Sequence, residues 1–203
     1  MELIFGTTNT AKISWLRGVL GGHGITVLGL EDVDSTKTRI AVDESGNTPR
    51  ENARIKAVSY YKLLARPVFS ADSGLYIRGL ADEKQPGAHI RRHPDGFEMN
   101  DEQTIEYYAR MAENHDGPMV AQYRNAVCLV IDENTMYEHD GDDIAIRPFI
   151  IAPKPHAMRT AGFPIDSLSV NIESGKYYFD IGKHENISSI ENGFLTFFKR
   201  VIK

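Results

Sequence analysis

The sequence predicts an α/β protein in which helices flank a central mixed sheet. Its first half alternates short apolar segments, at residues 3–5, 25–28 and 68–72, with amphipathic segments of helical period. Residues 120–131 predict a long strand that becomes continuously apolar, and Asp132-Glu133-Asn134 turns it back into Met136-Tyr137, which predicts a hairpin that extends the sheet. The chain has 203 residues, which suits one large domain or two intimate lobes.

The composition excludes several classes of protein. The net charge of −5 argues against a protein that coats nucleic acid, although a local cluster of cations is enough for a small phosphorylated ligand. No apolar segment is long enough to span a bilayer, and the first residues lack the features of a signal peptide. Cys128 is the only cysteine, so no internal disulfide can form. We therefore expect a cytoplasmic protein that binds neither membranes nor nucleic acid.

A cluster of helix-capping residues follows the first predicted strand. Thr7, Thr8 and Asn9 precede an amphipathic helix that ends at Gly21-Gly22. Lys12 lies in the first turns of this helix, where its charge opposes the helix dipole. Because helix N-termini bind phosphate, an anionic ligand would explain this lysine. A capped helix with a solvated lysine explains the segment equally well at this point.

The second predicted helix begins with a capping box and carries polar residues on one face. Thr48 and Glu51 form the capping box, and the helix continues to about residue 64. Asn52 and Lys56 are four residues apart and share a face. Glu44 lies just before the cap, where it could hold a metal-bound phosphate. The alternative is that Asn52 is a buried structural amide and that Lys56 is solvated.

Asp72 follows an apolar strand and precedes Ser73-Gly74 and a second apolar run. Asp-Ser-Gly is ordinary turn chemistry, so the simplest expectation here is a turn. A carboxylate at the end of a strand also suits a metal ion or a bound water. The segment alone favours the turn, and its neighbours along the chain favour a site.

The second half contains a further turn, a pair of arginines and a phenylalanine loop. Pro86-Gly87 predicts a turn. Arg91 and Arg92 follow, and they either clamp phosphate oxygens or are surface charges. Helices are expected over 101–114 and 185–202, and an extended segment over 144–151. Phe163 and Asp166 lie in the loop between them.

Four separated segments together resemble the ITPase-like family, the pyrophosphatases that cleave non-canonical purine nucleoside triphosphates. Each motif is weak alone, but their order and spacing are specific, and they cover the first half of the chain. The family's Thr-x-Asn-x-x-Lys is matched by Thr7, Asn9 and Lys12. Its Glu-x-Gly-x-Thr and Asn-Ala-x-x-Lys-Ala are matched by Glu44, Gly46, Thr48, Asn52, Ala53, Lys56 and Ala57. Its acidic pair with Ser-Gly-Leu, and its later Pro-Gly with a basic residue, are matched by Asp72, Ser73, Gly74, Leu75, Pro86, Gly87 and Arg91 or Arg92.

The second half of the chain departs from the family. Ala71 occupies the first place of the acidic pair. The late Gly-Phe-Gly-Tyr-Asp-Pro motif appears here only as Gly162-Phe163-Pro164-Ile165-Asp166-Ser167. The Ser-His-Arg that begins the last helix in the family, and helps to read the purine, is absent from residues 187–192. The phosphate and metal half of the motif set is therefore kept, and the base-reading half is changed.

The resemblance implies a single domain over residues 1–203, with two lobes around a cleft and an architecture also similar to anticodon-binding and Maf-like proteins. It implies a homodimer and hydrolysis of a nucleoside triphosphate to the monophosphate and pyrophosphate, with inosine, deoxyinosine or xanthosine triphosphate as substrates. It also implies Mg²⁺ held by Glu44 and Asp72, with Asp72 as the catalytic residue. The changed second half adds altered base selectivity to this expectation.

The remaining residues of the motif set are expected to contact substrate. Phosphate contacts are expected from Lys12, Lys56 and one of the two arginines, and base contacts from Phe163 and Asp166. For Phe163 the alternative is a loop aromatic that fills the core. The expected substrate contacts are Thr7, Thr8, Asn9, Lys12, Asn52, Lys56, Ser73, Gly74, Arg91, Arg92, Phe163 and Asp166. The alternative function is a catalytically weak or inactive nucleotide-binding relative, because of Ala71.

Overall fold

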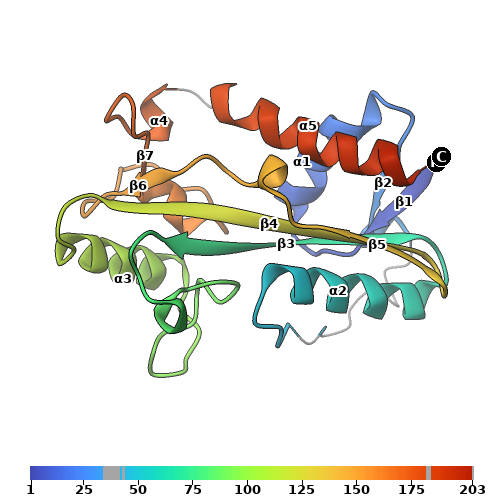
Figure 1. The fold of residues 1–203 in the computed structure, drawn as a ribbon, viewed down its shortest axis with the longest axis horizontal. Helices are drawn as coiled ribbons and strands as arrows, with labels where there is room; N and C mark the ends of the chain where they lie inside the picture. Colours follow the sequence, from blue (N-terminus) through green and yellow to red (C-terminus); the bar gives the residue numbers. More distant parts are fainter. Residues whose placement is uncertain (34–41, 43, 182–183, 203) are drawn as a thin grey trace. The chain divides into compact units, whose positions relative to one another are not determined.

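The computed structural model describes residues 1–33, 42, 44–181 and 184–202 (Figure 1). Contacts divide the chain into two compact units. The first unit comprises Met1–Ser73, Arg124–Ala145 and Ser189–Lys203, and the second comprises Gly74–Tyr123 and Ile146–Ser188. Two long strands contribute residues to both units.

The strands form a mixed sheet, as the sequence predicts. The described strands are β1 (Glu2–Phe5), β2 (Thr26–Gly29), β3 (Val68–Ile77), β4 (Met119–Asp132), β5 (Thr135–His139), β6 (Phe149–Ile151) and β7 (Ser169–Val170). Their order is β2-β1-β3-β4-β6-β7, and β5 also pairs with β4. β1 is parallel to β2 and β3, whereas β4–β5, β4–β6 and β6–β7 are antiparallel. The predicted hairpin is confirmed, with Asp132 opposite Thr135 at its turn.

The helices lie close to their predicted positions. They are α1 (Thr10–Gly21), α2 (Pro49–Leu64), α3 (Asp101–Glu113), α4 (Tyr178–Ile181) and α5 (His184–Val201). Short 3-10 helices occur at η1 (Leu30–Asp32), η2 (Asp82–Lys84), η3 (Asp142–Ile144) and η4 (Pro164–Leu168). Within 144–151, which was predicted as extended, Ile144 ends η3, and only Phe149–Ile151 form a strand, β6. Among the described residues, no helix is both long and apolar enough to cross a membrane.

The sheet of the first unit is covered on both faces, with α2 on one face and α1 and α5 on the other (Figure 1). Because side chains alternate along a strand, neighbouring residues of β3 meet different helices. Val68 packs with Tyr60 of α2. Phe69 stacks on Phe5 at 4.5 Å and meets Phe198 of α5 edge-on at 4.9 Å. This alternation decides which residues of β3 share a face with α2.

The expected turn at Asp72-Ser73-Gly74 is wrong. The structure continues β3 without a break from Val68 to Ile77. β3 neighbours β4 in the sheet, and beyond the residues that pair with β1, Leu75 exchanges backbone hydrogen bonds with Gly87. This pairing outweighs the local turn preference of Asp-Ser-Gly. Asp72 is therefore held in a regular strand, and its side chain direction follows from strand alternation.

The core of the second unit lies between α3 and the strands that it covers. Ile105 and Tyr108 of α3 pack in one apolar cluster with Ile165 and Leu168 of η4. Strand residues complete this cluster, and they are Leu75, Ile77, Met119, Ala121, Phe149 and Ile151. The burial of Ile165 shows that this position belongs to the core rather than to a surface that binds ligand.

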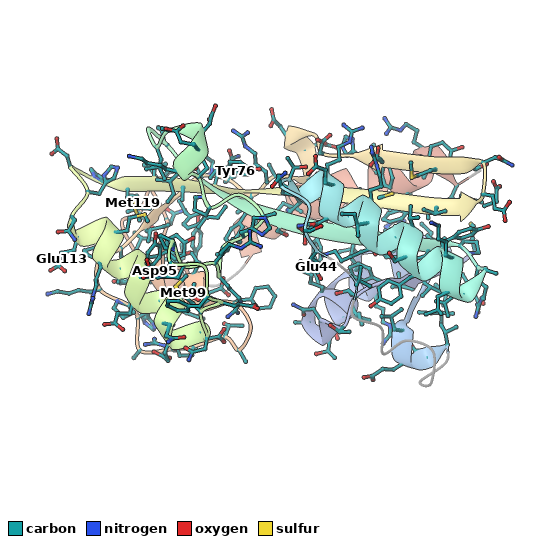
Figure 2. The ribbon with its side chains drawn as sticks, turned by 90° about the horizontal axis from the view of Figure 1, so that it is seen from below. Glu44, Tyr76, Asp95, Met99, Glu113 and Met119 are labelled. Carbon is teal, nitrogen blue, oxygen red and sulfur yellow. The ribbon has the colours of Figure 1, made fainter. Side chains whose placement is uncertain are left out.

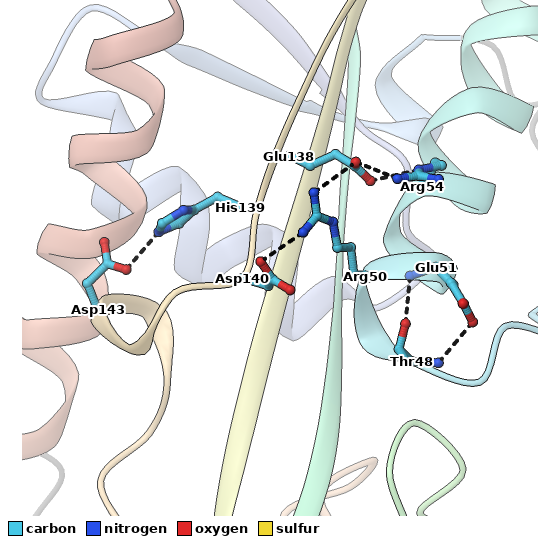
Figure 3. A network of polar contacts seen from close by, with 8 residues as sticks. All are labelled: Thr48, Arg50, Glu51, Arg54, Glu138, His139, Asp140 and Asp143. Carbon is cyan, nitrogen blue, oxygen red and sulfur yellow. Dashed lines mark hydrogen bonds and ion pairs between the residues drawn. The ribbon is translucent and has the colours of Figure 1, made fainter.

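An ion-pair network on the first unit connects α2 to the β4–β5 hairpin (Figure 3). Arg54 pairs with Glu138 of β5 at 2.6 Å, and Arg50 reaches the same carboxylate at 3.3 Å. The hydrogen bond from Arg54 lowers the pKa of Glu138. Because both arginine side chains are about half exposed, water screens these pairs and the network contributes little to stability.

Candidate active site

The first half of the candidate site is built on α2. Thr48 accepts a hydrogen bond from the backbone N–H of Glu51 at 3.2 Å, and the Glu51 carboxylate accepts one from the N–H of Thr48 at 3.3 Å (Figure 3). This capping box confirms the predicted start of the helix. It also fixes the helix register, which brings Asn52 and Lys56 onto the buried face.

Lys56 lies between two carboxylates. Its Nζ donates to Oδ1 of Asp72 at 2.6 Å and to Oε2 of Glu44 at 3.3 Å. The side chains of Lys56 and Asp72 are each 11% exposed, whereas that of Glu44, which precedes α2 (labelled in Figure 2), is 56% exposed. The cluster thus has a buried pair at its base and a carboxylate that water and ligands can reach.

Asn52 connects Asp72 to the loop that carries Glu44. Its Nδ2 donates to Oδ2 of Asp72 at 3.3 Å, and its Oδ1 accepts from the backbone N–H of Gly46 at 2.9 Å. A Cβ at Gly46 would lie 2.6 Å from Oδ1 of Asn52, so only glycine allows this approach. Asn52 is 2% exposed. It is a buried amide that positions the cluster, which is the alternative that the sequence left open.

The N-terminus of α1 adds a second lysine. Asn9 caps the helix by accepting from the backbone N–H of Lys12 at 3.1 Å, and Thr7 Oγ1 accepts from the N–H of Asn9 at 3.2 Å. Burial lowers the pKa of the Lys12 ammonium, attraction to Asp72 opposes this, and repulsion from Lys56 adds to it. Lys12 is therefore in the field of the same cluster. Thr7 and Asn9 order the helix start, and Thr8 is exposed beside them.

The carboxylates of Glu44 and Asp72 converge on one atom, Nζ of Lys56, so they also suit a small divalent cation. Among the described residues, no group of three or more His, Cys, Asp or Glu side chains is placed to hold a metal. A pair of carboxylates fits Mg²⁺, which completes its octahedral shell with waters and substrate phosphates. The two lysines balance the two carboxylates, so a divalent cation would give the cluster the positive charge that a polyphosphate requires.

Ser73 belongs to the other face of β3. Strand alternation places Val68, Ser70 and Asp72 toward α2, and Ala71 and Ser73 away from it. The Ser73 hydroxyl donates to Oδ1 of Asn125 at 2.7 Å, and Nδ2 of Asn125 donates to the carbonyl of Ile144 at 2.6 Å. The structure therefore does not bring the Ser73 side chain to Lys56. Sequence reasoning missed Asn125, although a polar residue within a long strand was a usable signal.

The remaining predicted residues lie in the second unit. Gly87 exchanges backbone hydrogen bonds with Leu75, so the Pro-Gly motif lies directly against the strand that continues from Gly74. Arg91 pairs with Asp101 at 2.5 Å. Arg92 is exposed and makes no ion pair with any described residue. Arg91 is thus held by an internal ion pair, whereas Arg92 carries a charge that has no ion-pair partner among the described residues.

Phe163 and Asp166 lie at the start of η4. Phe163 is half-buried, and its carbonyl accepts from the backbone N–H of Asp166 at 3.2 Å. Tyr123 lies near Asp166 and Arg91: burial raises its pKa, Asp166 raises it further, and Arg91 lowers it. Sequence reasoning missed Asp101, which holds Arg91, and it missed Tyr123. Neither residue carries a local signal, because both act through partners distant in the sequence.

The lowered pKa of Lys12 leads to a prediction about stability. Since the fold disfavours the charged form, Lys12→Met should raise Tm at neutral pH. Between the folded pKa and the ordinary value of 10.5, the folded wild type binds fewer protons, so its stability rises with pH. The gain should therefore shrink as the pH approaches 10.5 in thermal unfolding scans.

The matched control for this variant is Lys62→Met, because Lys62 is an exposed lysine of α2. This change should not raise Tm, because Lys62 lies in the last turn of α2, where a positive charge favours the helix dipole. A Lys12→Met protein that melts below the wild type at neutral pH would contradict our account of Lys12.

Comparison with known proteins gives matches to one family. The model of the Ham1 family matches residues 3–142. A dITP/XTP pyrophosphatase of Symbiobacterium thermophilum is 34% identical over 130 residues, which cover 64% of this chain and 61% of that protein. One of Halalkalibacterium halodurans is 33% identical over 129 residues, covering 64% of this chain and 62% of that protein. The match therefore spans less than two thirds of either relative.

The fold is also that of solved structures. The structure of the Staphylococcus aureus Ham1 protein aligns with 98% of this chain and 99% of its own, with a TM-score of 0.76 and 21% sequence identity. At this identity the likeness establishes the α/β fold. The family model covers more than half of the chain, in the part that carries the predicted motifs. This chain therefore belongs to the Ham1 family, which confirms the ITPase-like resemblance of its motifs.

Proposed function

We propose that this protein is a metal-dependent pyrophosphohydrolase that converts a nucleoside triphosphate and water to the monophosphate and pyrophosphate. The observation that carries this proposal is the cluster of Lys12, Lys56, Glu44 and Asp72 in the first unit. Membership of the family implies a nucleotide substrate and a divalent metal. Relatives named dITP/XTP pyrophosphatases support the reaction type.

Phosphate binding is assigned to the cations. Mg²⁺ held by Glu44 and Asp72 would neutralise charge on the phosphates. Lys12 and Lys56 attract phosphate oxygens, and the N-terminus of α1 favours negative charge through its N–H groups. Of the two arginines, we assign the phosphate contact to Arg92, because Arg91 is already paired with Asp101.

Asp72 is the residue we assign to the attacking water. In the proposed reaction the water oxygen bonds to the α-phosphorus, and the bond from that phosphorus to the oxygen that bridges to the β-phosphate breaks. Pyrophosphate leaves with the bonding electron pair, and the water gives its proton to the carboxylate. Lys56 and Asn52 each hold one oxygen of Asp72, which fixes the orientation of the carboxylate. Each oxygen keeps a further lone pair for the water.

The position of Ala71 bears on the alternative of an inactive relative. The side chains of Ala71 and Asp72 project from opposite faces of β3. Lys56 contacts the face from which Asp72 projects. A carboxylate at position 71 would therefore not have joined the described cluster. The retained set of Glu44, Asp72, Lys12 and Lys56 supports an active enzyme.

Base recognition is assigned to the second unit. We propose inosine, deoxyinosine or xanthosine triphosphate as substrates, with Phe163 stacking on the base and Asp166 accepting hydrogen bonds from its edge. The family's tyrosine is replaced by Ile165, which is 1% exposed and lies in the core. Fewer polar groups are then available to reject a wrong base, so we propose altered selectivity.

The catalytic assignment predicts that Asp72→Asn nearly abolishes pyrophosphate release. The change keeps the shape of the side chain and removes the charge that orients water and holds metal, so the rate should fall by at least about 100-fold. Pyrophosphate release with Mg²⁺ measures this, and far-ultraviolet circular dichroism should show an intact fold.

Asp95→Asn is the control for charge removal, since Asp95 has an 80% exposed side chain in the second unit (labelled in Figure 2). It should retain wild-type activity. Substantial activity in Asp72→Asn would show that the catalytic carboxylate lies elsewhere.

A further prediction concerns discrimination between nucleotide bases. The protein should hydrolyse inosine triphosphate, with an advantage over guanosine triphosphate far below the roughly 10⁴-fold that a complete set of buried hydrogen-bonding groups achieves. Specificity constants for both nucleotides, measured side by side in one magnesium buffer, decide this. A preference near that limit would mean that other residues replace the missing Ser-His-Arg.

We also propose a homodimer, on the basis of the family resemblance. Light scattering should then give a molar mass of twice the 22.8 kDa chain. A mass of one chain at micromolar concentration would contradict this proposal.

A further inference from the structure

The first turn of α3 holds the loop that carries Phe163. Asp101 is the first residue of α3, and its two carboxylate oxygens have different partners. Oδ1 pairs with the guanidinium of Arg91 at 2.5 Å, and Oδ2 accepts from the backbone N–H of Gly162 at 2.9 Å. One carboxylate thus joins three separate segments of the second unit.

We propose that Asp101 is a positioning residue for base selection, which fixes the loop that presents Phe163 and Asp166. The inference rests on the proposed function. It adds a residue that no motif of the family resemblance contains, and it assigns to Arg91 a role in support of Asp101 rather than in phosphate binding.

The loop depends on a specific backbone conformation next to Phe163. Gly162 has a φ of +81°, a value that side-chain-bearing residues rarely adopt. The backbone N–H of Phe163 donates to the carbonyl of Thr160 at 2.9 Å, so the chain turns tightly just before the aromatic residue. The hydrogen bond from Gly162 to Asp101 anchors this turn to α3. Loss of the anchor would let Phe163 move relative to the helix.

Apolar packing holds the end of the loop against α3, and the Asp101 contact holds the part that precedes Phe163. Ile165 and Leu168 of η4 are buried against Ile105 and Tyr108 of α3. A second polar contact with the same turn of α3 joins Arg159 to Glu102 at 3.0 Å, and the Glu102 side chain is 71% exposed. An exposed pair of this kind contributes little. The Asp101 side chain is 37% exposed, so its pair with Arg91 is also screened in part, but Asp101 in addition accepts the backbone N–H of Gly162, which fixes the loop itself.

The charge of Asp101 strengthens both contacts. The hydrogen bond from Gly162 lowers the pKa of Asp101, partial burial opposes this, and Arg91 lowers it further. The carboxylate is therefore ionised near neutral pH and forms charge-assisted hydrogen bonds, which are roughly twice as strong as neutral ones. An amide at this position keeps the size of the side chain and loses that strength.

The test compares Asp101→Asn with Glu106→Gln. Glu106 lies on the same helix, and its 62% exposed carboxylate pairs with Arg110 four residues later at 2.6 Å. KM and kcat are measured for inosine and guanosine triphosphates with Mg²⁺. Dissociation constants are measured by calorimetry for inosine and guanosine monophosphates, which are not turned over.

Asp101→Asn should raise KM for inosine triphosphate about tenfold, leave kcat within about twofold, and narrow the ratio of the two specificity constants. The dissociation constant of inosine monophosphate should rise as KM does. Glu106→Gln should have the kinetic and dissociation constants of the wild type. Arg91→Gln should give a smaller effect of the same kind. In the double variant the two effects should not add, because both act through one carboxylate.

The inference is overturned if Asp101→Asn leaves the nucleotide ratio and the dissociation constants unchanged. It is also overturned if the variant lowers kcat equally for both nucleotides in proportion to lost Tm, since that describes general destabilisation. A wild type that binds the monophosphates but releases no pyrophosphate contradicts the proposed function, and the calorimetric arm then still decides the role of Asp101. A wild type that binds neither monophosphate overturns both.

Discussion

The ion pair between Lys56 and Asp72 ties α2 to β3 in the first unit. Asp72 is 8% exposed, and a carboxylate buried to this degree is stable only if it is paired and hydrogen-bonded. Lys56 and Asn52 supply these contacts from one face of α2. The pair thereby fixes how α2 lies on β3, because a slip of one residue along the strand would turn Asp72 to the opposite face. A structural constraint and a candidate reaction centre therefore share the same atoms.

The cluster combines two lysines with two carboxylates, and one of the lysines is disfavoured by its surroundings. Lys12 lies close enough to Lys56 for repulsion, and burial disfavours its charge. Removal of Lys56 would leave the buried carboxylate of Asp72 without its ionic partner and is costly, whereas Lys12 makes no such pair and its burial disfavours the folded state. A polyphosphate with a divalent cation would compensate both lysines, which explains why a fold would retain this arrangement. Gly46 and Asn52 hold Glu44 near the cluster while its carboxylate stays accessible.

The second unit achieves order by different means. Its apolar cluster fixes η4 against α3, whereas the loop before η4 is held by polar contacts at the first turn of α3. Chemistry that all substrates share can rely on a buried, fully paired cluster. The proposed selection among bases would require positioned polar and aromatic groups, and the loop that carries Phe163 and Asp166 is held by a few hydrogen bonds. This difference agrees with the sequence, which keeps the motifs of the first half and changes those of the second.

Local sequence determined the helices and the spacing of the site on α2. The sequence predicted the capping box of Thr48 and Glu51 and the shared face of Asn52 and Lys56. Both features depend only on spacing within one helix. The sequence also identified the Ham1 family through its motifs. Tertiary structure alone decided that Asp72 lies within a strand. It also decided that Ser73 forms a hydrogen bond with Asn125 and that Arg91 forms an ion pair with Asp101. The physical reason is that a β-strand and a buried charge take their partners from distant segments, 52 residues away for Ser73 and Asn125, and these partners exist only once the chain has folded.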